Sequence, residues 1–168
     1  MKFELTQAQK QKYKEEGMVV LEDIFPPELH AHLALSSNGT NQFQTNLEQE
    51  KLLTFRGLGE ILHQLSQTRP IRLIYSEVLE KRHIDFRELP FQGLLIAIVI
   101  PLNENRTTII ATNSDYVVSE RSIVAVYGES NALLVKGKHN QDLFKLYTRN
   151  GYGSGDRLKS SDSPFVYR

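Results

Sequence analysis

The sequence predicts an α+β fold in which helices come first along the chain and the strands of a sandwich or barrel follow. Two observations lead to this prediction. Before residue 70 apolar residues recur at helical spacing, and after it they gather in about seven short segments rich in β-branched and aromatic residues. Only short stretches of turn-forming residues lie between these segments, which favours a sandwich or barrel over a parallel βαβ sheet.

Three helices are expected in the first part of the chain. Thr6 to Gln9 has the form of a capping box and Gly17 supplies a stop, so one helix should run from about residue 7 to residue 16. Pro27 can occupy the first turn of a second helix, which should end near residue 35. An apolar stripe at i, i+3, i+4 and i+7 predicts the third helix and consists of Leu58, Ile61, Leu62 and Leu65.

The strands are expected after Pro70, with one short strand, MVVLED, ahead of them. The longest apolar run is GLLIAIVIPL at 93–102, which is too short for a membrane helix of about 18 or more residues and is predicted to be a buried strand. SIVAVYG and NALLV are predicted as separate strands, and DLFKLYT as the last one. The Gly- and Ser-rich residues 151–168 are predicted to be a mobile tail, so that a single domain covers residues 1–150.

Composition narrows the classes of function. Lys plus Arg and Asp plus Glu both number 20, and a neutral chain lacks the positive field that supplies most nonspecific affinity for nucleic acids. The absence of cysteine excludes disulfides, thiolate zinc sites and cysteine nucleophiles. The first residues contain no apolar stretch that could serve as a signal peptide. We therefore expect a cytoplasmic protein whose partner is a small molecule rather than a nucleic acid or a membrane.

The first third of the chain resembles a known family. LTQAQKQKYKEEGMVVLEDIFPPELHAHL is similar to the opening of phytanoyl-CoA hydroxylase-like proteins, members of the Fe(II)/2-oxoglutarate oxygenase superfamily. The likeness continues through FRGLGEILHQLSQTRPIRLIYSEVL and into GLLIAIVIPLNE. The resemblance implies a double-stranded β-helix, which is a jelly-roll, cupin-like barrel, with the N-terminal helices packed outside it.

The resemblance also implies a site. In this family two histidines and one carboxylate hold non-heme iron, and an Arg or Lys binds the far carboxylate of 2-oxoglutarate. His83 and Asp85 form a His-x-Asp pair just before GLLIAIVIPL, and residues at i and i+2 point the same way from a strand. In one alignment of the late strands His139 is the distal histidine. Arg149, ten residues further on, then binds the cosubstrate.

A second alignment competes with the first. It takes SIVAVYGES as the late strand of the family and puts Asn131 or Ala132 where the distal histidine should be. His139 then lies in KGKHN, among turn residues and lysines. We favour this second alignment, because VAVYG keeps the strand alternation into a turn and NALLV then serves as the next strand.

Two hypotheses of function follow from these alignments. With a degenerate metal site, the protein is a binding or regulatory module on an oxygenase-like barrel, and His83 and Asp85 are solvated loop residues near Arg82 or Arg87. With an intact site, it is an Fe(II)/2-oxoglutarate-dependent hydroxylase of a small or lipid-like substrate. In that case His83, Asp85 and His139 hold the iron and Arg149 holds 2-oxoglutarate.

Overall fold

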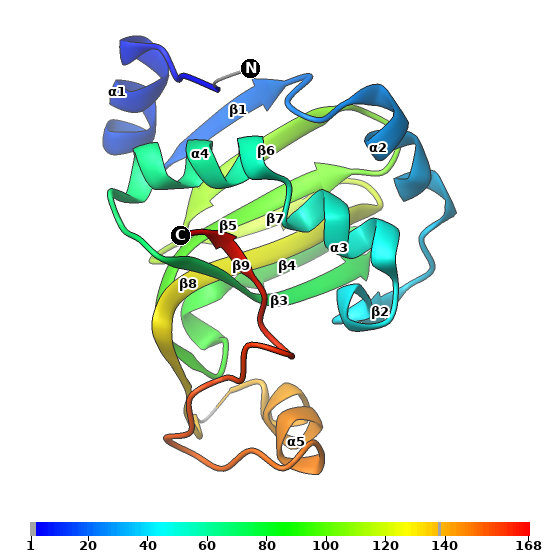
Figure 1. The fold of residues 1–168 in the computed structure, drawn as a ribbon, viewed down its shortest axis with the longest axis vertical. Coiled ribbons are helices and arrows are strands. Elements are labelled where there is room, and N and C mark those ends of the chain that lie inside the picture. The colour runs from blue at the N-terminus through cyan, green and yellow to red at the C-terminus, as the bar shows by residue number, and fades with distance from the viewer. Residues whose placement is uncertain (1–2, 138) are drawn as a thin grey trace.

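A seven-stranded antiparallel sheet organises the part of the chain that the structure, a computed structural model, describes: residues 3–137 and 139–168 (Figure 1). Its strands are β1 (Met18–Glu22), β2 (Gly39–Thr40), β3 (Ile71–Leu79), β5 (Phe91–Pro101), β6 (Arg106–Ala111), β8 (Ser122–Leu134) and β9 (Phe165–Tyr167). The spatial order is β1-β6-β5-β8-β3-β2, with β9 also paired to β3. A separate two-stranded ribbon consists of β4 (Arg82–Asp85) and β7 (Asp115–Val118).

The helices belong mainly to the N-terminal part of the chain. They are α1 (Gln7–Glu16), α2 (Pro27–Ala31), α3 (Leu47–Leu53), α4 (Arg56–Ser66) and α5 (Gln141–Arg149), with 3-10 turns η1 (His32–Leu35), η2 (Gln42–Gln44) and η3 (Phe86–Glu88). In Figure 1, α1 to α4 lie over one face of the sheet, and α5 lies at the far end of the molecule. None of the helices in the described residues is long and apolar enough to cross a membrane.

Local signals account for the helices that the sequence predicts. The Thr6 hydroxyl accepts a hydrogen bond from the Gln9 amide, while the Gln9 side chain accepts one from the Thr6 amide, so the capping box forms. Gly17 ends α1 with a φ of 69°, a left-handed conformation that favours glycine. The apolar stripe of α4 is buried at Leu58, Ile61 and Leu62. The predictions of α1 and α4 are confirmed. Helix α3 was not predicted, although Asn46 caps it by accepting hydrogen bonds from the Glu48 and Gln49 amides.

Burial on both faces explains the continuous apolar runs of the central strands. On β5, Ile98 and Ile100 face the helix side, whereas Ala97 and Val99 face the other side. On β8, Ala125 and Tyr127 likewise alternate with Val124 and Val126. A strand that is covered on both faces reads as apolar throughout, since successive side chains point to opposite faces. The α+β jelly-roll architecture of the sequence prediction is confirmed.

The opposite face of the sheet is covered by later segments of the chain. Ile84 and Phe86 from the β4 region and Val118 from β7 pack against the cluster that includes Val124 and Val126. Tyr147 of α5 joins the same cluster, with a ring-centroid distance of 5.1 Å to Phe91. The ribbon and α5 therefore cover this face of the sheet, as α1 to α4 cover the other face.

Two strand predictions are wrong. DLFKLYT forms most of helix α5, because its apolar residues also fit a helical spacing and Tyr147 is buried from that helix. SIVAVYG and NALLV are one 13-residue strand, β8, which runs through Gly128. A Cβ at Gly128 would lie 2.7 Å from the carbonyl oxygen of Gly93 on β5. This glycine therefore permits a close backbone approach between two strands and does not mark a turn.

The C-terminal residues 151–168 lie against the sheet, where the sequence predicts a mobile tail outside the domain. Phe165 and Tyr167 of β9 pair with the start of β3. Arg72 of β3, only 5% exposed, donates hydrogen bonds to the carbonyl oxygens of Ser163 (2.8 Å) and Leu158 (2.9 Å). A third hydrogen bond from Arg72 reaches the carbonyl of Ser130 at 3.2 Å. One buried arginine thus holds the C-terminal segment to the sheet.

We predict that Arg72→Met destabilises the fold by about 2–4 kcal/mol, because it leaves buried carbonyl groups without donors. Urea unfolding measures this loss. Arg56→Met is the matched control, because the Arg56 side chain is 90% exposed and contacts only Glu60 as an ion pair, at 3.3 Å. The control should change stability by about 0.5 kcal/mol or less. Equal losses in the two variants would contradict the assigned role of Arg72.

Candidate functional site

The β4–β7 ribbon positions the His-x-Asp pair. The cross-strand partners are Arg82 with Val118, His83 with Val117, Ile84 with Tyr116, and Asp85 with Asp115. Ile84, Tyr116 and Val118 pack on the apolar cluster beneath the ribbon, so this side faces inward. Directly paired residues share a face, and neighbouring residues alternate. His83, Asp85, Asp115 and Val117 therefore face outward, consistent with the 56% exposure of Val117.

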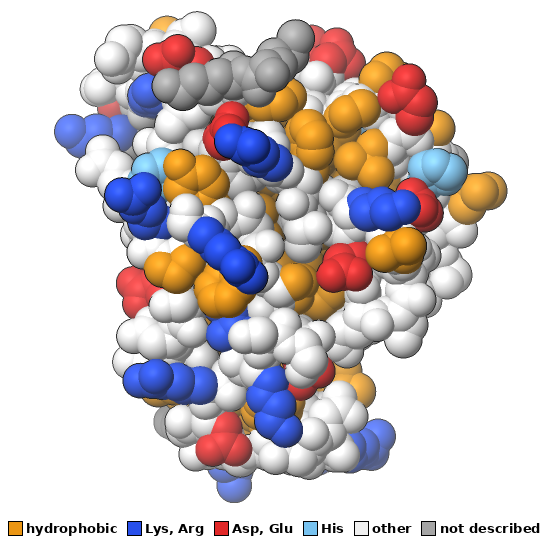
Figure 2. All heavy atoms as spheres, viewed as in Figure 1, with side chains coloured by type: hydrophobic (Ala, Val, Ile, Leu, Met, Phe, Trp, Pro, Cys, Tyr) orange, Lys and Arg blue, Asp and Glu red, His pale blue; other side chains and the backbone are white. Residues whose placement is uncertain are grey.

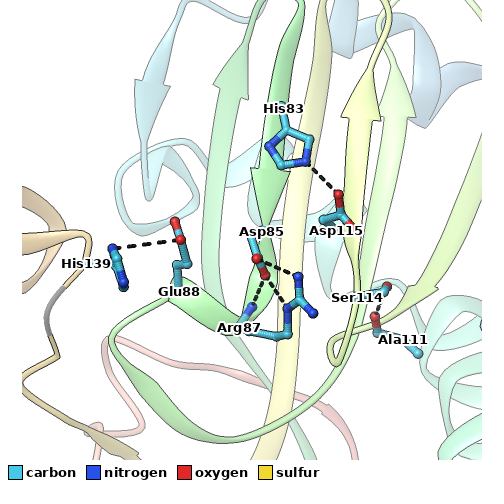
Figure 3. Close-up of polar contacts among 8 residues, drawn as sticks. All are labelled: His83, Asp85, Arg87, Glu88, Ala111, Ser114, Asp115 and His139. Carbon is cyan, nitrogen blue, oxygen red and sulfur yellow. Dashed lines mark hydrogen bonds and ion pairs between the residues drawn. The ribbon is translucent and has the colours of Figure 1, made fainter.

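The outward residues contact one another (Figure 3). The Nε2 atom of His83 lies 2.6 Å from Oδ2 of Asp115. Arg87 donates two hydrogen bonds to the Asp85 carboxylate, from Nε to Oδ1 and from Nη2 to Oδ2, each 2.7 Å long. The Asp85 carboxylate also accepts a hydrogen bond from the Arg87 amide at 3.0 Å, and so caps η3. Both carboxylates are thus engaged by a neighbouring cationic or imidazole group.

The two predicted residues further along the chain lie elsewhere. Nδ1 of His139 lies 3.8 Å from the Glu88 carboxylate, on the side away from the His83–Asp115 pair in Figure 3. Arg149 is the last residue of helix α5 and not part of a barrel strand. Within residues 3–137 and 139–168, no three His, Asp or Glu side chains come close enough together to hold a metal ion.

Neither alignment of the late strands describes what lies beside His83. Asn131 and Ala132 belong to β8, and Ala132 packs against Gly93 of β5. The strand beside β4 is β7, and Asp115 is the residue next to His83. Sequence reasoning missed Asp115. The alternating segment DYVV marks a strand there, but a single sequence does not contain the cross-strand register.

The contacts that these residues make decide whether they could hold an iron ion. A facial triad needs three ligands that converge on one point and leave open positions for cosubstrate and oxygen. His83 pairs with Asp115, Arg87 occupies both oxygens of Asp85, and His139 lies beside Glu88 and not with the other two. Toward the interior the same strand presents Ile84, which has no ligand atom. The arrangement does not fit iron held by His83, Asp85 and His139.

A pocket of about 450 Å³ is bounded by β3, β4, η3 and α5, and its lining includes His83 and Asp85 as well as Ile84. Its polar wall includes Glu77 of β3, which accepts a hydrogen bond from the Tyr75 hydroxyl and lies 3.5 Å from Nη1 of Arg82. Burial, and then the nearby Glu77 carboxylate, raise the pKa of Tyr75 well above its ordinary value. This hydroxyl therefore stays protonated and acts as a donor to Glu77.

Helix α5 forms the facing wall of the pocket. Asn140, which precedes the helix, and Leu143, Leu146 and Arg149 of the helix line the pocket, and along the helix each of the last three is a surface neighbour of the next. Tyr147 fixes the helix in place: its hydroxyl donates a hydrogen bond to the Ile74 carbonyl at 3.0 Å and accepts one from the Asn41 side chain at 2.8 Å. Burial raises the pKa of Tyr147 above its usual range, so the donor is retained. The wall is consequently held by the core.

We predict that two independent contacts lower the carboxyl pKa values of the ribbon. The Arg87 guanidinium lowers the pKa of Asp85, and the hydrogen bond with His83 lowers that of Asp115. In a carboxyl-carbon NMR titration, Arg87→Gln should raise the pKa of Asp85 much more than that of Asp115, and His83→Gln should do the reverse. Because both values are lowered, their contribution to stability is present above the unfolded pKa of about 3.9. It is lost as the pH falls through the folded values. Equal shifts of both carboxyls in either variant would contradict this pairing.

Comparison with known proteins places the fold. No protein-family model matches the sequence, and no curated protein matches it. Among solved structures, the non-heme alpha-ketoglutarate-dependent carbocyclase SnoK from nogalamycin biosynthesis matches with a TM-score of 0.76 and 14% identity, over 96% of each chain. The epimerase SnoN from the same biosynthesis matches with a TM-score of 0.73 and 13% identity, over 95% of this chain and 98% of its own.

A third similar structure is that of CT296 from Chlamydia trachomatis. Its TM-score is 0.59 at 15% identity, and the match covers 76% of this chain and 97% of that one. Identities this low establish the fold and not the chemistry. The chain therefore has the α+β jelly-roll fold of the Fe(II)/2-oxoglutarate oxygenases.

Proposed function

We propose that this protein is a small-molecule-binding or regulatory module on an oxygenase-type barrel whose iron site is degenerate. One observation carries the proposal: His83 and Asp85 line the pocket, but each is engaged by a neighbour, Asp115 and Arg87 respectively. His139 lies beside Glu88, so no three of these groups come together in the part of the chain that the structure describes. The pocket has a volume in the range of about 300–1,000 Å³ that is usual for ligand sites.

The charges of the outer face support the same proposal. A divalent ion at Asp85 would have to displace Arg87 from both carboxylate oxygens. His83 and Asp115 together offer only two ligands, so water would take most of the coordination positions of an iron ion bound there. Without iron, 2-oxoglutarate would lose the metal half of its binding site.

The alternative is an active Fe(II)/2-oxoglutarate-dependent hydroxylase of a small or lipid-like substrate. It is favoured by the likeness to solved structures such as that of CytC3 with Fe(II) and alpha-ketoglutarate. In that reading His83, Asp85 and His139 hold the iron and Arg149 holds the cosubstrate. The phytanoyl-CoA hydroxylase-like pattern of the N-terminal third would then identify the branch of the superfamily.

We predict that anaerobic titration with Fe(II) and 2-oxoglutarate gives neither a stoichiometric heat of binding nor the metal-to-cosubstrate charge-transfer band. Arg149 alone supplies a charge-assisted contact of about 1.5–3 kcal/mol. This is less than the roughly 4 kcal/mol that corresponds to millimolar binding. Stoichiometric uptake of both compounds, abolished separately by His83→Ala and His139→Ala, would restore the enzyme. Arg56→Ala, a substitution on the opposite face of the sheet, serves as the control.

A further inference from the structure

Each carboxylate that lines the pocket has a basic side chain nearby. Asp85 is paired with Arg87 at 2.7 Å, and Glu77 lies 3.5 Å from Arg82. Asp142 lies 3.8 Å from Lys145, and Glu88 lies 3.8 Å from the imidazole of His139. An incoming cation would therefore have to compete with a partner at each of these carboxylates.

Arg149 differs from the other charged groups of the wall. Of the two arginines that line the pocket, Arg82 is paired with Glu77, whereas Arg149 has no carboxylate within 4.0 Å among the described residues. Its exposed position at the last turn of α5 suits the helix dipole, but that interaction leaves the guanidinium donors available. The pocket thus has one positive charge without a partner.

The remainder of the wall beside Arg149 is apolar. Leu143 and Leu146 lie on the same side of α5 as Arg149, and Ile84 faces them from β4. Further apolar lining comes from Phe86, Leu89 and Val124. A ligand that fills this space gains from burial of an apolar body, at about 25 cal/mol per Å².

We infer that the pocket takes a small organic monoanion, with its carboxylate on Arg149 and its apolar body between Leu146 and Ile84. This inference rests on the proposed binding function and names its ligand class. A planar guanidinium binds a carboxylate through two parallel hydrogen bonds, which makes the arginine selective for this group. A dicarboxylate such as 2-oxoglutarate fits less well, because its second charge would meet Glu77 or Asp142 and no unpaired cation.

The experiment compares four probes of similar size by calorimetry and by amide chemical-shift mapping: hexanoate, hexan-1-ol, hexylammonium and 2-oxoglutarate. Hexanoate should bind best and shift amides of α5 and β4. Arg149→Gln should weaken hexanoate about tenfold or more while leaving hexan-1-ol within about twofold, as expected for the loss of one charge-assisted contact. Arg149→Glu should make hexylammonium the preferred probe. Arg56→Gln removes the same charge far from the pocket and should have no effect.

Each outcome bears on one proposal. Equal binding of hexanoate and hexan-1-ol, or hexanoate binding that survives Arg149→Gln, overturns the ligand class and leaves a binding pocket of another specificity. The absence of binding by all four probes also overturns the ligand class. The binding module itself is refuted separately, by the iron titration described above. Circular dichroism of the Arg149 variants confirms that this exposed position has not unfolded the helix.

Discussion

The sheet has to be covered on both faces, and most other features of the molecule follow from this requirement. Strands β5 and β8 place apolar side chains alternately on the two sides, so a single layer of helices could shield only half of them. The N-terminal helices cover one side. The other side receives pieces from distant parts of the sequence: the β4–β7 ribbon, α5 and the C-terminal segment. In Figure 2 the face that carries the N-terminal helices shows charged side chains of both signs interspersed with hydrophobic ones.

The same requirement decides the orientation of the ribbon. A two-stranded ribbon that covers an apolar face must turn its own apolar side inward, and here that side consists of Ile84, Tyr116 and Val118. Strict alternation then turns His83 and Asp85 to the solvent, where Asp115 and Arg87 engage them. The inner side of the ribbon thus contributes to packing, and the pocket beside it takes polar groups from β3, β4 and α5.

The sequence predicted those elements that local patterns determine. The capping box of α1, the stripe of α4 and the apolar run of β5 each lie within about a dozen residues, so no tertiary information is needed to recognise them. The pattern of DLFKLYT fits both a strand and a helix. The two are distinguished only by tertiary packing, in which Tyr147 of α5 is buried. The position of residues 151–168 depends on Arg72, some 90 residues earlier, which binds backbone carbonyls that every sequence possesses. The inward or outward direction of His83 depends on the register with β7, which is equally non-local.

The hydroxyl of Tyr147 joins three places that synthesis separates widely. It bonds Asn41 and the carbonyl of Ile74, across sequence separations of 106 and 73 residues. During translation, the first strands and helices therefore emerge well before the segments that shield the second face of the sheet. Until α5 and the segment with Tyr152 and Leu158 have left the ribosome, Ile74, Val99 and Val126 have only part of their cover, and this apolar surface can associate with other chains. Contacts across such long sequence separations also form slowly, because the entropy of loop closure must be overcome before they stabilise the fold.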